Sequence, residues 1–348
     1  MDYLGRLGMN FDGFIEQTKN KTVPEDFYFD NFSEVKKLCE KIISLDDEYT
    51  FSSLDEMVVQ NLNSVIKPGV QISVLASGGA DSTFLLSLIA KHFPNNDLVA
   101  YFGKTANNSS EFEAVRMLCN ELGARVSILT PSLAGLERQL ALFYDVNDRY
   151  PNDIAQPLHN LIVSTIRSDN CSAIIVDGQY ADTLMFANPQ NMFFSWWQHT
   201  ANNPIIKKVI RTLGLMNFIS LRPGQSDLRD LLGAGFADEA SLIAWICRID
   251  PSVKVRDSLK ALLHVYSSEV VMQVVFYKVL LHFREKDKYS LCPELISPFN
   301  DIKLMVDAWR RPKLYNSLFM RKIPIWTYIK AAHPDIAGLV KRRSFEAI

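Results

Sequence analysis

Residues 71–92 read QISVLASGGADSTFLLSLIAKH, an apolar run followed by a glycine turn and a second apolar segment. The run 71–76 predicts a short buried strand, because its apolar residues are bounded by turn residues. From 84 to 89 the apolar residues recur at the spacing of one helix face. Between the two lies Ser77-Gly78-Gly79-Ala80-Asp81-Ser82, and we expect the helix to begin at about Ser82. This strand–loop–helix unit decides the fold.

The same alternation continues along the chain. It predicts further strands at 98–102, 125–129 and 173–176, and helices at 110–122, ending at Gly123, and near 155–168. Short apolar strands that alternate with helices predict an α/β fold, with a parallel sheet and helices on both faces. Elsewhere helices dominate: we expect them at 32–44, at 53–66 and, as one buried helix, at 263–283.

The predicted organisation has three parts. Residues 1–66 form an N-terminal helical extension, 67–190 a nucleotide-binding α/β domain, and 191–348 a helical C-terminal part that completes the active-site cleft. No internal repeat or low-complexity segment interrupts this order.

Composition narrows the class of protein. The chain has 348 residues, 48% of them hydrophobic, and its 37 basic and 39 acidic residues give a net charge of -2, which disfavours nucleic acid as a partner. The five cysteines are scattered without a CxxC pair, so neither a disulfide scaffold nor a zinc knuckle is expected. The N-terminus lacks an apolar signal segment, and the stretch 263–283 carries charged residues. We expect a soluble, cytoplasmic protein that does not act at a membrane.

The loop 77–82 has the residues of a phosphate-binding site. Two glycines allow the backbone to approach an anion closely, and the following helix N-terminus adds N–H donors and a favourable dipole. Ser77 and Ser82 supply hydroxyl donors, while the Asp81 carboxylate beside an anion suits a bridging Mg²⁺. No GK[ST] follows, so the loop is not a Walker A motif. The alternative is an ordinary turn that binds nothing.

A second acidic segment follows the fourth predicted strand. Residues 176–183 read VDGQYADT and end a strand at the same edge of the sheet, so Asp182 can approach the loop. Two carboxylates flanking a triphosphate would each hold a Mg²⁺. By itself DGQYAD is equally consistent with a turn.

These two segments carry a resemblance to a known family. SGGADS after a strand resembles the PP-loop of the ATP pyrophosphatase group, which has an adenine nucleotide α-hydrolase-like fold. Together with GQYADT it makes residues 50–345 similar to the synthetase domain of asparagine synthetases and to β-lactam and carbapenam synthetases. Residues 297–301 (SPFND) are similar to the family's RxPFLD segment without its arginine, Lys322 lies in the place of KxxLR, and 333–345 resembles the family's ending.

The resemblance implies ATP and Mg²⁺ as cofactors and assigns roles to individual residues. Asp81 and Asp182 would hold the metals, and the adenine would lie against the backbone near 75–76 and 101–102. Lys322 would contact the phosphates, and Arg342 takes the place of a second family lysine. Gln179 replaces an acidic residue or a tyrosine and can orient a substrate but not act as a general base. The nucleotide-binding residues implied in this way are Ala76, Ser77, Gly78, Gly79, Asp81, Ser82, Tyr101, Phe102 and Gly178.

The implied activity is that of an ATP-dependent ligase which forms AMP and pyrophosphate. It would adenylate a small-molecule carboxylate and then form an amide with ammonia or an amine, or by ring closure. About 66 residues precede the first predicted strand and residue 2 is aspartate, so we expect no glutaminase domain, and a separate protein that supplies ammonia is one option. Two alternatives stay open: a catalytically drifted nucleotide-binding or scaffold protein, which Gln179 and Thr183 favour, and a tRNA- or sugar-modifying PP-loop enzyme. A homodimer is also left open.

Overall fold

The computed structural model describes most of the α/β part and several helical segments outside it. The described residues are 32–48, 53–105, 108–147, 151, 155–185, 253–267, 269–271, 273–274, 277–278, 292, 294–315 and 322–340.

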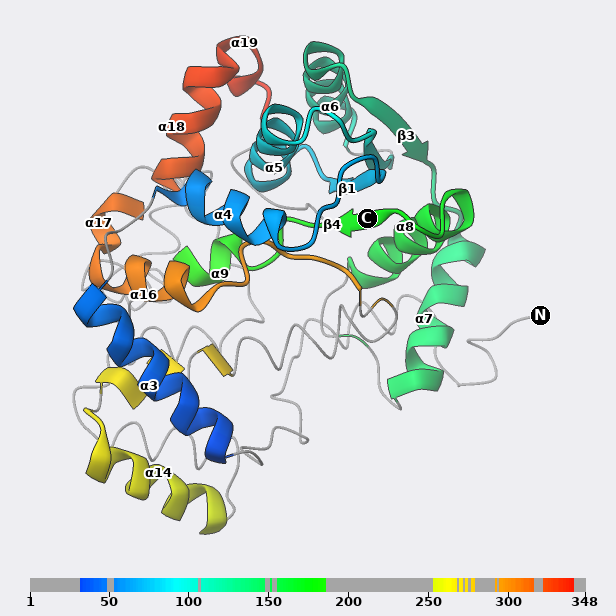
Figure 1. Cartoon of the computed structure of the whole chain (residues 1–348). Coiled ribbons are helices and arrows are strands. Elements are labelled where there is room, and N and C mark those ends of the chain that lie inside the picture. The colour runs from blue at the N-terminus through cyan, green and yellow to red at the C-terminus, as the bar shows by residue number, and fades with distance from the viewer. Residues whose placement is uncertain are drawn as a thin grey trace, which may run out of the picture.

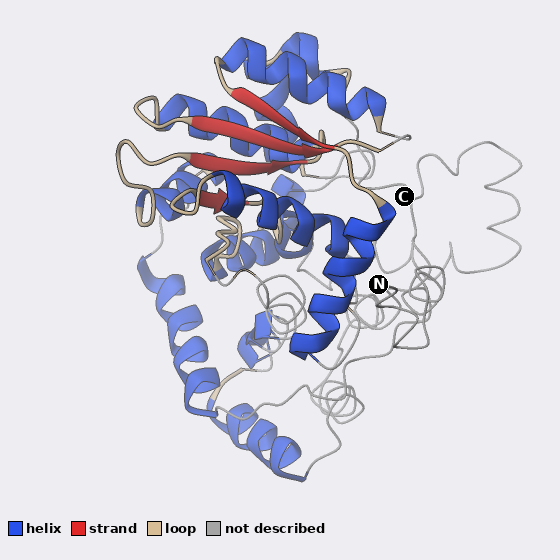
Figure 2. Ribbon diagram, turned by 90° about the vertical axis from the view of Figure 1, so that its right-hand side faces the viewer, coloured by secondary structure: helices blue, strands red, loops and turns tan. Residues whose placement is uncertain are grey.

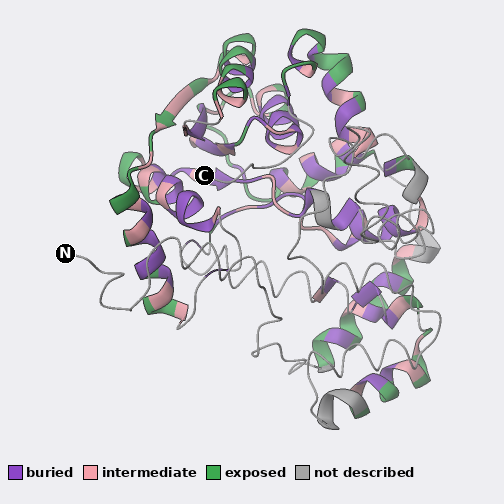
Figure 3. Cartoon of the chain, turned by 180° about the vertical axis from the view of Figure 1, so that it is seen from behind, coloured by how far each residue is buried: buried purple, intermediate pink, exposed green. Residues whose placement is uncertain are grey.

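A parallel sheet lies at the centre of the fold, as the sequence predicts. Its four strands run in the order β3-β2-β1-β4, and every neighbouring pair is parallel. The strands are β1 (Ile72–Ala76), β2 (Leu98–Gly103), β3 (Arg125–Leu129) and β4 (Ile174–Val176). The two inner strands β1 and β2 are almost wholly buried, whereas β3 at the edge is half-exposed (Figure 3). Beyond β4, Ile296 forms a parallel bridge with Val176 and extends that edge.

Helices cover both faces of the sheet, which confirms the predicted α/β architecture (Figure 2). On one face, α5 (Ala80–His92) and α6 (Ser109–Leu122) share a core with Val74, Ala100 and Val176. On the other, α7 (Leu133–Asn147) and α8 (Gln156–Asp169) pack on Tyr101 and Ile175. The alternation of side chains along a strand produces this division. Gly123 ends α6 at φ 67, as expected for a glycine C-cap.

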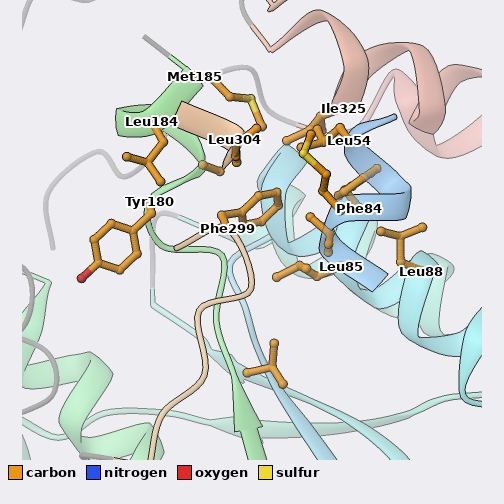
Figure 4. Packing of buried hydrophobic residues seen from close by; sticks show 14 of the residues in the cluster. Leu54, Phe84, Leu85, Leu88, Tyr180, Leu184, Met185, Phe299, Leu304 and Ile325 are labelled. Atoms are coloured by element: carbon orange, nitrogen blue, oxygen red, sulfur yellow. The ribbon is translucent and has the colours of Figure 1, made fainter. Parts of the chain in front are cut away.

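The other helices add to the first of these two cores (Figure 1). Phe84 of α5 stacks on Phe299 at 6.1 Å and meets Tyr328 edge-on at 5.0 Å between ring centroids. Figure 4 shows how Leu54, Leu304 and Ile325 approach from three further helices. The helix that carries the glycine loop is therefore held by segments distant in the sequence. The elements concerned are α3 (Phe32–Glu48), α4 (Leu54–Asn63), α9 (Ala181–Met185), α14 (Val253–Val265), α16 (Ile302–Arg310), α17 (Pro312–Tyr315), α18 (Ile323–Ala332) and α19 (Pro334–Ala337).

Two helix predictions need correction. The stretch 263–283 is not one helix: α14 ends at Val265, residue 267 is not helical, and the Ser267 hydroxyl accepts the Val270 N–H at 3.4 Å. A serine that bonds nearby backbone groups competes with helix continuation. In addition, α5 begins at Ala80 rather than at about Ser82, because Gly79 adopts the extended N-cap conformation. Asp81 consequently lies in the first turn of α5.

No described helix has both the length and the apolar character needed to span a membrane. The domain boundaries at residues 66 and 190 stay predictions.

Burial protects most of the described cysteines. Cys39, Cys119 and Cys292 are buried, whereas Cys171 is exposed in the turn before β4. Burial raises the pKa of the Cys119 thiol to about 11, which lowers the thiolate fraction at pH 8 roughly 100-fold. We expect iodoacetamide to label Cys171 much faster than Cys119 in the native protein, as followed by peptide mass spectrometry. Equal labelling rates before unfolding would contradict the packing of α6.

Candidate nucleotide site

The loop between β1 and α5 is held together by its own hydroxyls. The buried Ser82 hydroxyl accepts the Ser77 N–H at 3.2 Å and lies 3.2 Å from the Gly79 carbonyl oxygen, to which it donates. The Ser77 hydroxyl is 3.2 Å from that of Ser82 and accepts the Gly79 N–H at 3.3 Å. Ser77 itself is exposed. The buried Ser82 therefore stabilises the conformation of the loop, and Ser77 lies on the solvent side, where a ligand would bind.

Gly78 and Gly79 contribute to the structure of the loop in different ways. Gly78 adopts φ +71, and a Cβ placed there would lie 2.5 Å from the Glu111 Cβ and 2.7 Å from the Glu111 carbonyl oxygen. The first turn of α6 thus packs directly on the loop backbone. Gly79 is the N-cap of α5 and has no side chain to satisfy the first N–H groups of that helix. Those donors lack intrahelical acceptors and point out of the helix end, which favours an anion there.

Replacing Gly78 by alanine should destabilise the loop more than the same change at Gly69. Both glycines have a positive φ, +71 and +78, and alanine costs about 1–2 kcal/mol in that region. Only at Gly78 does the added carbon meet the backbone of another helix, which adds about 1–3 kcal/mol. Thermal unfolding should show a larger drop in melting temperature for Gly78→Ala than for Gly69→Ala. Equal behaviour of the two variants would mean that Glu111 does not confine the loop.

The segment after β4 lies against the start of α5. A Cβ at Gly178 would be 2.9 Å from the Asp81 Cβ, so the two backbones are in close contact. Gln179 is half-buried, whereas Tyr180 is 2% exposed and has φ 69. Figure 4 shows the Tyr180 ring directed away from Phe299. Asp182 lies in the first turn of α9, and its side chain is outside the described residues.

Lys322 reaches this site from a distant part of the chain. Its Nζ donates to the Asp81 Oδ2 at 2.6 Å, and the two side chains are 13% and 20% exposed. Lys322 is the N-cap of α18 and has φ 55, a conformation that non-glycine residues seldom adopt. Because α18 packs on α5 through Tyr328 and Phe84, the lysine is held beside the loop. A cation and a carboxylate thus meet at the entrance to the helix N-terminus.

The residues expected near an adenine lie side by side in the sheet. Ala76 pairs with Phe102, and Leu75 with Tyr101, at the carboxyl ends of β1 and β2. The Tyr101 hydroxyl donates to the Asp169 Oδ2 at 3.1 Å, and burial, followed by this bond, raises the pKa of the phenol. The Phe102 side chain is buried in the core that contains α5 and α6, and the Tyr101 side chain in the core that contains α7 and α8. The adenine position near the backbone of 75–76 and 101–102 stays a prediction.

The structure brings together most of the residues predicted for the site. The loop, Gly178, Gln179 and Lys322 converge at the carboxyl edge of β1 and β4, whereas Arg342 lies outside the described residues. Among the described residues, no group of three or more His, Cys, Asp or Glu side chains forms a metal cluster. A metal at Asp81 would need further ligands from Asp182, water or the nucleotide itself.

Sequence reasoning missed a buried polar group behind the site. Asp177 is 2% exposed and accepts hydrogen bonds from the Ser297 hydroxyl and from the Gln179 N–H at 3.2 Å. His159 Nε2 lies 3.5 Å from its other oxygen. His159 is a lone histidine in the sequence, and Ser297 is 120 positions from Asp177, so local pattern gives no signal for their contact. The one available clue was that Asp177 directly follows a strand.

No protein-family model matches the chain, and no curated protein matches it. Among solved structures, the chain is similar to an NH3-dependent NAD synthetase from Campylobacter jejuni in complex with the nitrate ion, at 12% identity and a TM-score of 0.30, over 72% of this chain and 95% of that one.

Proposed function

We propose that the chain binds ATP with Mg²⁺ at the loop 77–82 and is a ligase that forms AMP and pyrophosphate, adenylating a carboxylate before it forms an amide. The observation that carries this proposal is the convergence of Gly78, Asp81, Gly178 and Lys322 at one edge of the sheet. Ligands of open parallel sheets bind outside the carboxyl ends of the strands, and this edge is such a place. The family resemblance of SGGADS and GQYADT supports the same assignment.

The donor set suits the phosphates of a nucleotide. The N–H groups of the first turn of α5 lack intrahelical acceptors, and Lys322 adds a positive charge. Ser77, Gln179 and Lys322 are exposed or half-buried, while Gly78 and Ser82 are buried behind them. The ligand-facing residues are thus accessible, and the supporting residues are fixed by packing.

The residues also fit Mg²⁺. Asp81 already holds a positive charge, the Lys322 ammonium at 2.6 Å, and carboxylate oxygen is a ligand that Mg²⁺ prefers. Mg²⁺ commonly uses one or two carboxylates together with phosphate oxygens and water, so a cluster of three protein ligands is not needed. Asp81 and Asp182 would hold it. When bound, Mg²⁺ neutralises charge on the phosphates and so favours departure of pyrophosphate.

In the proposed reaction, a carboxylate oxygen of the substrate attacks the α-phosphorus of ATP, and the bond from that phosphorus to the bridging oxygen breaks. Pyrophosphate leaves and stays against the N–H donors at the start of α5. A nitrogen nucleophile then attacks the acyl carbon, the bond from that carbon to the AMP oxygen breaks, and the nitrogen loses its proton to solvent water. Lys322 leaves Asp81 for the phosphates and stabilises their negative charge. Gln179 orients the acyl substrate by hydrogen bonds, since an amide cannot remove the proton.

A second candidate is a nucleotide-binding protein without catalysis, and Gln179 favours it. The side chain lies at the site, where the family resemblance leads us to expect a residue that handles protons. A thiolating enzyme fits the described residues less well. Cys39, Cys119 and Cys292 are buried, and Cys171 precedes β4 and so lies at the opposite edge of the sheet from the loop.

The decisive assay measures nucleotide products with a panel of small carboxylic acids, with ammonia or primary amines present. We expect AMP and pyrophosphate in equal amounts, together with acid-dependent exchange of labelled pyrophosphate into ATP. Binding of ATP without AMP formation across the panel would favour the non-catalytic candidate. Formation of ADP and phosphate would contradict the proposed reaction.

A further inference from the structure

The carboxylate of Asp177 is buried beneath the candidate site and contacts its own turn and two other segments. Ser297, on the segment that extends the sheet beside β4, donates to Oδ1, and the Gln179 N–H donates to the same oxygen. His159 of α8 lies 3.5 Å from Oδ2. Burial of a polar group is costly unless hydrogen bonds replace its hydration, and for Asp177, which is 2% exposed, these hydrogen bonds go to Oδ1. The sequence assigns no role to this residue.

These contacts fix the backbone that faces the loop. A carboxylate that accepts the N–H two residues later forms an Asx-turn, and here the turn encloses Gly178. Gly178 in turn lies against Asp81, where even one added carbon would come within 2.9 Å of the Asp81 Cβ. The position of the turn is therefore coupled directly to the first turn of α5.

The same turn sets the start of α9. Tyr180 follows it at φ 69, and its carbonyl oxygen accepts the Leu184 N–H at 2.8 Å. A non-glycine residue in this conformation needs support from its surroundings, which the burial of Tyr180 and the Asp177 turn provide. The first turn of α9 contains Asp182. The turn that accepts its support from Asp177 thus leads directly through Gln179 into the start of α9.

The segment that bears Ser297 is itself anchored. The Ile296 N–H donates to the Ile175 carbonyl oxygen at 2.8 Å, and the Asp177 N–H donates back to the Ile296 carbonyl oxygen at 2.9 Å. Asn61 of α4 donates to the Pro298 carbonyl oxygen at 2.8 Å. The Ser297 hydroxyl is consequently a donor in a fixed position and not a mobile surface group.

We propose that Asp177 is a positioning residue, which places Gln179 and the first turn of α9 against the loop 77–82 through hydrogen bonds and not through its charge on a ligand. This inference rests on the proposed function for its effect on catalysis. Its effect on the backbone is independent of that function. Asparagine at 177 preserves the shape and an oxygen that accepts from Ser297 and Gln179, with its NH₂ directed to His159, whereas alanine removes both.

The test compares Asp177→Asn with Asp177→Ala and uses two readouts. The first is amide hydrogen exchange in a peptide that covers 177–185, which needs no activity. The second is kcat and KM for ATP in the AMP-formation assay. We expect Asp177→Ala to raise exchange in this peptide at least tenfold and to lower kcat about 30-fold, with KM within about threefold of wild type, because the turn orients groups that act in the transition state. Asp177→Asn should stay within about threefold of wild type in both readouts.

Ser297 and Ser87 supply the matched variants. Ser297→Ala should move both readouts in the direction of Asp177→Ala, and Ser297→Thr, which keeps the hydroxyl, should restore them. Ser87→Ala removes another buried hydroxyl, bonded to the Thr83 carbonyl oxygen within α5, and should change neither readout. Melting temperatures of all variants show whether each one folds.

Three outcomes would count against the proposed role of Asp177 or against the proposed function. In the first, Asp177→Asn loses as much activity as Asp177→Ala while its own amide hydrogen exchange in the peptide 177–185 stays at the wild-type level. In that case Asp177 acts through its charge, and the inference is overturned. Unchanged exchange in a folded Asp177→Ala or Ser297→Ala variant overturns it as well. If the wild-type protein forms no AMP with any acid, the proposed function fails, and the exchange measurements still decide whether Asp177 holds the turn.

Discussion

Replacing Asp81 by alanine should abolish acid-dependent exchange of pyrophosphate into ATP while leaving the fold intact. Asp81 is the carboxylate at the entrance to the α5 N-terminus, and its partner is the Lys322 ammonium. Removing it takes away the group that would hold Mg²⁺ beside the phosphates. Loss of one such electrostatic contact lowers rates by about 100- to 1,000-fold, which brings exchange to background. The same result is expected for Asp182→Ala, since Asp182 would hold Mg²⁺ together with Asp81.

Asp97 provides the control for this prediction. It also forms an ion pair, with Arg125, but it precedes β2 and so lies at the opposite edge of the sheet. Asp97→Ala should keep wild-type exchange. Circular dichroism and the melting temperature establish that the Asp81 and Asp182 variants fold. Unimpaired exchange in a folded Asp81→Ala protein would remove Asp81 from the mechanism.

Replacing Lys322 by alanine should have two effects of opposite sign. AMP formation should fall about 100- to 1,000-fold, because the cation that stabilises the phosphates is lost. The affinity for Mg²⁺ in the absence of nucleotide should rise, because the ammonium 2.6 Å from Asp81 no longer competes with the metal. Calorimetric titration with MgCl₂ measures the second effect separately from catalysis.

Lys330 lies on the same helix, α18, and is exposed, so Lys330→Ala controls for the general loss of one positive charge. We expect neither catalysis nor Mg²⁺ affinity to change in that variant. Lys322→Arg keeps the charge but replaces a compact ammonium with a planar guanidinium, and it should recover only part of the activity. A rise in Mg²⁺ affinity in Lys330→Ala as large as in Lys322→Ala would show that the effect is not specific to Asp81.

The local sequence pattern was sufficient to predict the strands of the sheet and the loop after β1. The runs 72–76 and 98–103 are short, apolar and bounded by turn residues, so their burial follows from composition alone. Gly123 marks the end of α6 because a left-handed C-cap favours glycine. The start of α5 was placed two residues late, since Ala80 and Asp81 carry no apolar signal and the helix boundary depends on the Gly79 backbone.

Contacts between segments that are distant in the chain could not be predicted from the local sequence pattern. Lys322 and Asp81 are 241 positions apart, and only the family resemblance placed both at the phosphates. Asp177, His159 and Ser297 meet because β4, α8 and the segment at 296 converge at one sheet edge, a tertiary property. The apolar content of 263–283 likewise suggested one helix, although Ser267 interrupts it through a bond to nearby backbone.

The central claim is that the loop 77–82 binds the pyrophosphate end of ATP together with Mg²⁺. Calorimetric titration of the wild-type protein with pyrophosphate in the presence of MgCl₂ measures this without any knowledge of the acyl substrate. We predict saturable binding that competes with ATP, requires Mg²⁺ and disappears in Asp81→Ala. Binding of equal strength in wild type and Asp81→Ala, or ATP binding that pyrophosphate does not displace, would contradict the claim.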